Sequence, residues 1–363
     1  MGQRVDSFWR MRLADRIAQC RVPFLVQNVR DHSVLHLTGA TDFAKVILEC
    51  PMRYVLTDEL IRLCTALAYS KGTRTLACAD LLHVPAPRVW IEWCEAPCRT
   101  ELALYGFKCG SEDTQAWGRR GVLIESSLTG RRGLIRTFWA QNDTELDVLA
   151  GCMEAYFDFD TAEGEEPVAP DAVDRSAIII FDDVNGGADV LRRCFRFRYE
   201  RTWADYYAKA ALSPEQRSAI AHHSLGTIAI DIPVVLAFLL LLATRPGLPR
   251  RPLMLERLNR VRTRSGKMPL LDHVVVFSPL LPEYRPTSGG ESSLTRRAPR
   301  LHHVRGHLVR RGSQFFWRVP HLRGSARSGV IRSRTVTWTL DQTQSERATT
   351  QYATHSQSHV HLH

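Results

Sequence analysis

The feature that most constrains the fold is a run of apolar residues from Ile232 to Ala243, which follows Asp231. The run holds about a dozen residues, whereas a helix that spans a membrane needs roughly twenty. We therefore expect a fully buried core helix, and a membrane helix is the alternative. This helix is expected to form the core of a second domain.

The chain has 363 residues, 44% of them apolar, so it is long enough for two domains or for one large core with appendages. A charged fraction of 24% is typical of globular proteins. Charged residues such as Arg4, Asp6 and Arg10 interrupt the N-terminal stretch, so we expect no signal peptide. The predicted location is the cytoplasm, without a membrane partner.

The cysteines favour a reducing compartment. All nine lie at or before Cys194, at irregular spacings. Cys94, Cys98 and Cys109 have a loose zinc-like spacing that lacks a second paired half. We interpret the cysteines as reduced and partly buried, and we expect no metal and no other cofactor.

Charge is distributed unevenly along the chain, whose formal net charge is +10. Residues 154–189 carry eleven acidic side chains and one arginine, whereas residues 251–340 carry eighteen basic and four acidic ones. Seventeen of those eighteen are arginine, which makes forked contacts with phosphates, carboxylates and base edges. The excess favours a polyanionic partner, most commonly nucleic acid. An intramolecular contact with the acidic segment 154–189 is the alternative.

Residues 40–141 are predicted to form an antiparallel sheet with a layer of helices. Thr57 or Asp58 would cap a helix with an apolar stripe. Residues 34–37 read as a short strand. Four further strands, separated by turn residues, would form a meander: 88–93, 101–109, 121–127 and 133–140.

The middle of the chain is predicted to be mainly helical. Ser213 and Pro214 would begin a helix whose last turn carries His222 and His223. An amphipathic helix is expected at 254–261 and a strand at 270–277. The fold class is therefore α+β, with these predicted parts: an N-terminal α+β domain (1–153), an acidic linker (154–175), a mainly helical domain (176–281), a flexible connection (282–300), a basic β-hairpin module (301–340) and a disordered tail (341–363).

Residues 301–324 are predicted to form a basic hairpin. Runs of β-forming residues flank Arg311-Gly312-Ser313, which suits a turn. In the first run, His303, Arg305 and His307 recur at period two and would share one face. The second run brings aromatic and basic residues back beside them. This stretch is where the sequence points to chemistry.

We therefore predict a protein that binds RNA or DNA. Basic side chains of the amphipathic helix and of the hairpin would neutralise phosphates, while aromatic side chains would stack on exposed bases. The sequence has no recognisable helix-turn-helix, zinc-finger or ribonucleoprotein pattern, so it does not support sequence-specific readout. The candidate contacts are Arg260, Arg262, Arg264, Lys267, Arg310, Arg311, Trp317, Arg318 and Arg323.

The first alternative is a metal-independent ribonuclease. His303 and His307 would supply base and acid, since imidazole titrates near neutral pH, and Arg305 would hold the charged phosphate. His321 is an alternate on the returning strand. Residues four apart on one strand are separated by roughly 13 Å at Cα, which exceeds a single phosphate. The two histidines would have to converge, or a cross-strand pair would replace them.

The second alternative is a non-enzymatic regulatory or virion-associated protein, with the N-terminal domain as its recognition surface. Sequence patterns for ATP use, for serine hydrolases and for zinc proteases are missing from the chain. These enzyme classes therefore have no support from the sequence.

Residues 258–270 read LNRVRTRSGKMPL, and residues 302–324 contain His-x-x-Arg-Gly-His-x-x-Arg followed by Trp and Arg-Gly. Both stretches resemble a family of uncharacterised phage, prophage and bacterial proteins. With the segment between them, the resemblance covers about a fifth of the chain. It implies a phage-associated origin and no particular activity. The second pattern consists of His302, Arg305, Gly306, His307, Arg310, Trp317, Arg323 and Gly324.

Overall fold

The chain forms two compact units in the computed structural model. The first comprises residues 1–280 and 307–318, and the second comprises residues 281–306 and 319–363. The residues whose structure is described are 10–19, 24–27, 34–36, 40–69, 79–105, 118–140, 148–161, 194–200, 204–205, 207, 209, 213–244, 247–279, 300–304, 307–311, 314–318, 321–323 and 325–330.

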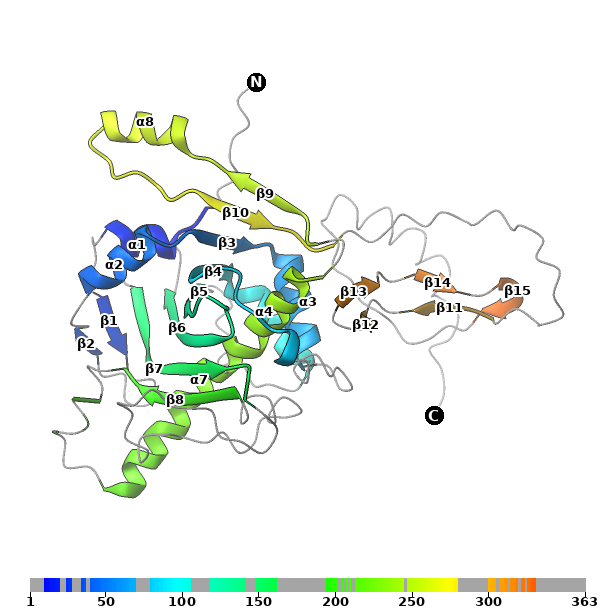
Figure 1. The fold of residues 1–363 in the computed structure, drawn as a ribbon, viewed down its shortest axis with the longest axis horizontal. Coiled ribbons are helices and arrows are strands. Elements are labelled where there is room, and N and C mark those ends of the chain that lie inside the picture. Colours follow the sequence, from blue (N-terminus) through cyan, green and yellow to red (C-terminus); the bar gives the residue numbers. More distant parts are fainter. Residues whose placement is uncertain are drawn as a thin grey trace, which may run out of the picture. The chain divides into compact units, whose positions relative to one another are not determined.

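A ten-stranded mixed sheet forms the centre of the first unit (Figure 1). Its strand order is β2-β1-β7-β6-β5-β4-β3-β10-β9, and β8 also pairs with β7. Strands β4 to β7 run antiparallel in succession, whereas β3 is parallel to both of its neighbours. The strands are β1 (Phe24–Gln27), β2 (Val34–His36), β3 (Met52–Leu56), β4 (Arg88–Cys94), β5 (Arg119–Ser126), β6 (Arg132–Ala140), β7 (Val148–Asp158), β8 (Phe195–Tyr199), β9 (Arg250–Leu253) and β10 (His273–Val276).

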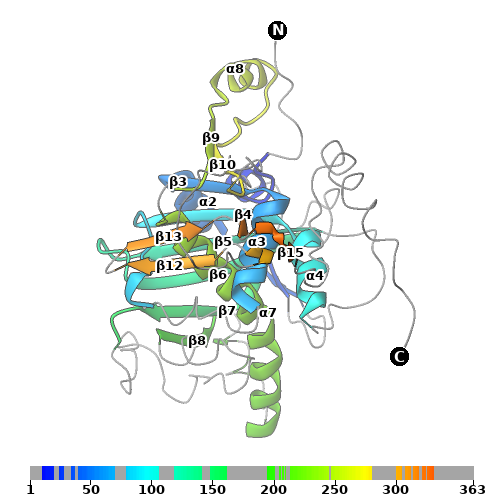
Figure 2. The same cartoon turned by 90° about the vertical axis from the view of Figure 1, so that its right-hand side faces the viewer.

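Helices cover both faces of this sheet. α3 connects the parallel strands β3 and β4, and it packs with α4 and α7 on one face (Figures 1 and 2). α1 and α2 pack on the opposite face. The helices are α1 (Leu13–Gln19), α2 (Ala40–Leu48), α3 (Asp58–Tyr69), α4 (Glu95–Leu104), α7 (Pro214–Leu242) and α8 (Glu256–Arg264), with a 3₁₀ turn at Ala79–Leu81.

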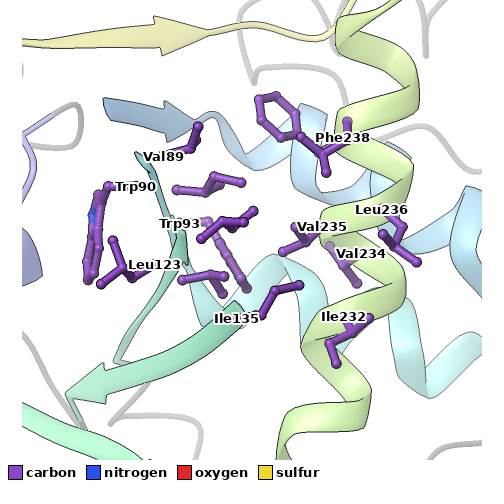
Figure 3. Packing of buried hydrophobic residues seen from close by; sticks show 14 of the residues in the cluster. Val89, Trp90, Trp93, Leu123, Ile135, Ile232, Val234, Val235, Leu236 and Phe238 are labelled. Atoms are coloured by element: carbon purple, nitrogen blue, oxygen red, sulfur yellow. The ribbon is translucent and has the colours of Figure 1, made fainter. Parts of the chain in front are cut away.

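Helix α7 supplies the centre of the core. Every side chain from Val234 to Leu241 is at most 3% exposed. Figure 3 shows Val234 and Val235 directed towards Trp93 and Ile135 of the sheet. This low exposure confirms the prediction of a buried helix. Burial of each Val, Leu or Phe side chain contributes about 1.5–3 kcal/mol. Among the residues that the structure describes, no helix combines the length and the apolar character needed to cross a membrane.

A buried carboxylate fixes α1 to the opposite face. Glu92 of β4 is fully buried and accepts hydrogen bonds from the backbone N–H groups of residues 12–14 at 2.6, 3.1 and 3.3 Å. It also accepts from Arg119 Nε at 2.8 Å and from Trp90 Nε1 at 3.2 Å. Since the first N–H groups of a helix lack partners within the helix, Glu92 caps α1 from the sheet. This carboxylate is structural.

The second unit contains a small sheet with the order β14-β11-β15. A separate two-stranded sheet, β12–β13, belongs to the first unit. The antiparallel pairing of β12 with β13 agrees with the centre of the predicted hairpin, whereas the outer parts of the expected runs, β11 and β14, belong to the other sheet. The strands are β11 (Arg300–Val304), β12 (His307–Arg311), β13 (Gln314–Arg318), β14 (His321–Arg323) and β15 (Ser325–Val330).

The predicted elements of the N-terminal part are confirmed, with one exception. The helix expected after residue 57 is α3, and the strands expected at 34–37, 88–93, 121–127 and 133–140 are β2, β4, β5 and β6. The strand expected at 101–109 is wrong over its first residues, because these belong to α4. Cys98 and Leu102 point into the core from α4, so the apolar residues there serve a helical stripe.

The sequence predicted that the helix beginning at Pro214 ends at His222 and His223, and this prediction is wrong. The helix continues as one helix of 29 residues to Leu242. Asp231 and Pro233 resemble a helix start but lie inside α7. The carboxylate of Asp231 faces Arg120 of β5 at 3.5 Å instead of capping a helix.

The chain also divides differently from the predicted domains. The boundary expected at residue 153 falls inside β7, and the expected linker 154–175 begins within that strand. Strands β8, β9 and β10 join the sheet of the N-terminal part, and α7 packs on it. One compact unit therefore holds the described residues of both expected domains. Residues 162–193, 280–299 and 331–363 lie outside the described residues, as do the predictions made for them.

Candidate nucleic-acid interface

Residues 250–272, here called the arm, leave the edge of the sheet along β9 and return into β10. In Figures 1 and 2, α8 lies at the far end of the arm, away from the sheet. None of the α8 side chains is buried. The amphipathic helix predicted at 254–261 is therefore confirmed as an element, but it serves an exposed extension and not a core.

Hydrogen bonds within the arm hold α8 in place. The side-chain amide of Asn259 donates to Leu270 O and accepts from Leu270 N, both at 2.8 Å. Gly266 has a φ of 66°, which glycine adopts readily, and it ends the helix. Lys267 N then donates to Arg262 O at 2.9 Å. A helix of nine residues is marginal alone, so these contacts preorganise it.

The base of the arm is fastened to the body of the unit. Asp15 of α1 accepts a hydrogen bond from Leu271 N at 2.8 Å, and Asp272 accepts from Leu255 N at 2.7 Å. Arg53 donates to the backbone oxygen of Asp272 at 3.4 Å. Burial raises the pKa of Asp15 to about 7, although the bond from Leu271 acts in the opposite direction. The arm therefore starts from a fixed base.

One face of α8 carries three arginines outwards. Arg257, Arg260 and Arg264 are exposed and recur at the helical spacing i, i+3, i+7. Val261 lies on the same stripe and is 57% exposed. Arg262 is on the other side of the helix, where its Nε donates to the backbone oxygen of Met268 at 2.9 Å. The outward face is thus cationic with one apolar side chain at its centre.

The arm has few carboxylates to neutralise it. It contains seven basic and two acidic residues. Glu256 pairs with Arg260 at 3.1 Å, but both side chains are largely exposed, so the pair is weak. Within the described parts of the chain, Arg257, Arg264 and Lys267 have no carboxylate partner. The basic residues are Arg250, Arg251, Arg257, Arg260, Arg262, Arg264 and Lys267.

Arginines on the sheet are arranged in the opposite way. Glu154 of β7 is buried and accepts from Arg136 Nε at 2.6 Å and from Arg198 Nε at 2.9 Å. Burial alone would lower the pKa of Arg136, but Glu154 and Glu125 outweigh it and raise that pKa. The alternating charges, here called the charge row, run across β4 to β8 and end at Glu49, which follows α2 and pairs with Arg88. Its members are Glu49, Arg88, Glu125, Arg136, Glu154 and Arg198.

The predicted hairpin contacts lie on β12 and β13. Their register pairs Leu308 with Trp317 and Arg310 with Phe315. Arg311 ends β12 opposite Gln314, and the side chain of Arg318 is exposed. The structure therefore brings Arg310, Arg311, Trp317 and Arg318 onto one small two-stranded sheet. Arg323 is on β14, which belongs to the second unit.

The predicted catalytic residues do not share one strand. β11 ends at Val304 and β12 begins at His307, and these strands belong to different compact units. Within the second unit, His303 pairs in register with Leu322, and His321 pairs with Val304. Arg305 lies outside the described residues. The expectation that His303 and His307 line one face of a single strand is therefore wrong, because β11 and β12 belong to different sheets.

The described part of the acidic segment does not shield the arm. Glu154 belongs to the charge row, Asp158 pairs with Arg132 at 3.0 Å, and Asp160 pairs with Arg131. Residues 162–189 of that segment lie outside the described residues. In the described ranges, no group of three or more His, Cys, Asp or Glu side chains could hold a metal ion.

Sequence reasoning missed part of the arm. Arg250 and Arg251 are exposed on β9, next to Pro252. Two adjacent arginines between Pro249 and Pro252 are a sequence pattern that favours an exposed edge strand. The anchoring role of Asp15 had no signal in the sequence, since Leu271 follows it by 256 positions.

Comparisons of the chain with protein-family models, with curated proteins and with solved structures found no match.

Proposed function

We propose that the protein binds nucleic acid through the arm. The observation that carries this proposal is an exposed, preorganised extension with seven basic and two acidic residues. Polyanions with regularly spaced phosphates complement such a surface, and release of their counterions drives binding. Contacts from the hairpin residues Arg310, Arg311, Trp317 and Arg318, and from Arg323, belong to the same proposal.

The contrast with the charge row supports a binding role over a merely solvated surface. Where arginines stabilise the sheet, carboxylates stand beside them, as Glu154 does for Arg136 and Arg198. On α8, Arg257 and Arg264 have no such carboxylate among the described residues. Positive side chains that lie close together repel one another in the protein without a ligand, and an anionic partner relieves this repulsion.

The test is a titration of fluorescent 20-base-pair DNA and single-stranded RNA at several salt concentrations. A six-alanine variant replaces the exposed cations of the arm: Arg250→Ala, Arg251→Ala, Arg257→Ala, Arg260→Ala, Arg264→Ala and Lys267→Ala. A control variant removes exposed cations outside the arm: Arg10→Ala, Lys45→Ala and Lys209→Ala.

We expect the wild-type association constant to fall steeply with salt, with a log–log slope of about −3 to −5. The six-alanine variant should bind about 100-fold more weakly at 0.1 M salt, or worse, while the control variant loses much less. Unchanged affinity in the six-alanine variant, or an equal loss in the control, would contradict the proposal.

A further inference from the structure

We infer that the ligand of the arm is duplex DNA and that α8 enters its major groove. This inference rests on the proposed function and specifies the class of nucleic acid. It starts from the shape of the arm: α8 has no buried side chain and lies at the tip of an extension in both views of the molecule (Figures 1 and 2). A helix presented in this way can be approached along its length.

The dimensions of α8 match those of the major groove. An α-helix with its side chains is about 10–12 Å wide, and the major groove of B-form DNA is about 12 Å wide. The major groove of an RNA duplex is deep and narrow, so a helix on an arm is excluded from it. The side chains of α8 can therefore reach base edges in a DNA duplex but not in an RNA duplex.

The outward stripe of α8 carries groups that suit base edges. Arg257, Arg260 and Arg264 can donate two hydrogen bonds to the acceptors of guanine in the major groove. Val261, 57% exposed at the centre of the stripe, suits the methyl group of thymine. Arg257 and Arg264 are seven positions apart, which is about 10 Å along the helix axis. This length corresponds to about three base-pair steps of about 3.4 Å.

Cations beside α8 are placed to contact the phosphates. Arg250 and Arg251 are exposed on β9, and Lys267 is exposed just after the end of α8. They flank the helix along the chain on both sides. A groove-bound helix is normally positioned by such backbone contacts, which carry no sequence information. Two roles follow, readout for the stripe and positioning for the flanking cations.

Two variants with equal loss of charge distinguish these roles. The stripe variant carries Arg257→Ala, Arg260→Ala and Arg264→Ala, and the flank variant carries Arg250→Ala, Arg251→Ala and Lys267→Ala. All six side chains are exposed, so both variants should fold, which circular dichroism and thermal melting verify. The probes are a DNA duplex and an RNA duplex of the same length and sequence, at one salt concentration.

We expect the wild type to bind the DNA duplex at least about tenfold more tightly than the RNA duplex. The stripe variant should lose this preference, to within about twofold. The flank variant should keep it, while its affinity for both duplexes falls and its salt slope decreases by about one per removed cation. Methyl green, which occupies the major groove, should compete with the wild type, whereas the minor-groove ligand netropsin should not.

Equal binding of both duplexes by the wild type, or equal loss of preference in the two variants, would overturn groove entry and leave nucleic-acid binding intact. Competition by netropsin alone would also overturn it. Failure to bind either duplex at low salt would overturn this inference, and failure to bind single-stranded RNA as well would overturn the proposed function.

Discussion

The arm and the charge row hold arginines in opposite settings. In the row, the carboxylate of Glu154 lies between Arg136 and Arg198, and each guanidinium is partly buried. In the arm, Arg257 and Arg264 extend from a helix without a carboxylate partner among the described residues. The count of arginines therefore does not identify a binding surface. The positions of the carboxylates do.

The difference has a structural cause. Directly opposite residues on antiparallel strands have Cβ atoms about 4.5–5.5 Å apart, so a sheet holds charge pairs at contact distance. Arg136 and Glu154 are opposite in register, and so are Glu154 and Arg198. An exposed helical pair such as Glu256 and Arg260 contributes only about 0.3–0.5 kcal/mol. Arg257 and Arg264 of α8 are exposed and have no carboxylate partner among the described residues.

The largest expected decrease in the free energy of unfolding comes from replacing Glu154 in the charge row. In Glu154→Gln, two partly buried guanidinium groups lose their shared carboxylate, and we expect the free energy of unfolding to fall by about 2–4 kcal/mol. Urea denaturation measures this change. In the matched control Glu256→Gln, the change should stay below about 0.5 kcal/mol. Similar values for both variants would show that the two settings do not differ.

The contribution of Asp15, which joins the arm to α1, to the stability of the protein should depend on pH. Asp15 has a pKa of about 7 in the folded protein, above the value of about 3.9 for an unfolded chain. Because the folded state then binds more protons between pH 4 and 7, this group makes the protein less stable as pH rises through that range. In Asp15→Asn, the loss between pH 4 and 8 should be about 3–4 kcal/mol smaller.

Urea denaturation at several pH values measures the Asp15 effect, with Glu59→Gln, an exposed carboxylate, as the control. The buried Asp231, with a pKa that burial raises to about 6, acts in the same direction and is present in both variants. Identical pH dependence in Asp15→Asn and in the wild type would contradict the role of Asp15 at the base of the arm.

A smaller effect is expected from loosening the arm. Asn259→Ala removes the two hydrogen bonds to Leu270, each contributing about 0.5–1.5 kcal/mol. Amide hydrogens of α8 should exchange about tenfold faster, while those of α7 are unaffected. Thr263→Ala, an exposed position on α8, is the matched control. Equal exchange in both variants would mean that α8 does not depend on Asn259.

The smallest effect concerns the one carboxylate of α8. Glu256→Gln releases Arg260 from its exposed pair and raises the positive charge of the arm. DNA affinity at 0.1 M salt should increase about two- to threefold, and the gain should vanish at high salt because screening removes it. Weaker binding would indicate that the pair positions Arg260 for the ligand.

Most of the described helices and strands could be predicted from sequence patterns. Apolar periodicity identified α3, α8 and the buried part of α7, and the Ser213-Pro214 start of α7 was correct, with Ser213 forming a capping box. The division of the chain was not predictable in the same way. Pairing of β10 with β3 joins residues more than two hundred positions apart, and local patterns carry no record of such contacts.

The candidate site was predicted in part. Arg260, Arg264 and Lys267 were identified from composition, and the structure places them on the exposed arm. The expected strand face was wrong because strand period was extended from His303 to His307, which lie on β11 and β12 of different sheets. The ribonuclease site itself stays a prediction. The sequence also gave no support for groove readout, since α8 matches no known motif. Its exposure became visible only with the fold.

The most direct test of the comparison is chemical labelling of arginines with phenylglyoxal, read out by mass spectrometry with and without duplex DNA. We predict fast labelling of Arg257 and Arg264 in the free protein, protection of both by DNA, and slow labelling of Arg136 and Arg198 in either case. Labelling of the charge row as fast as the arm, or arm arginines that DNA leaves unprotected, would contradict the account.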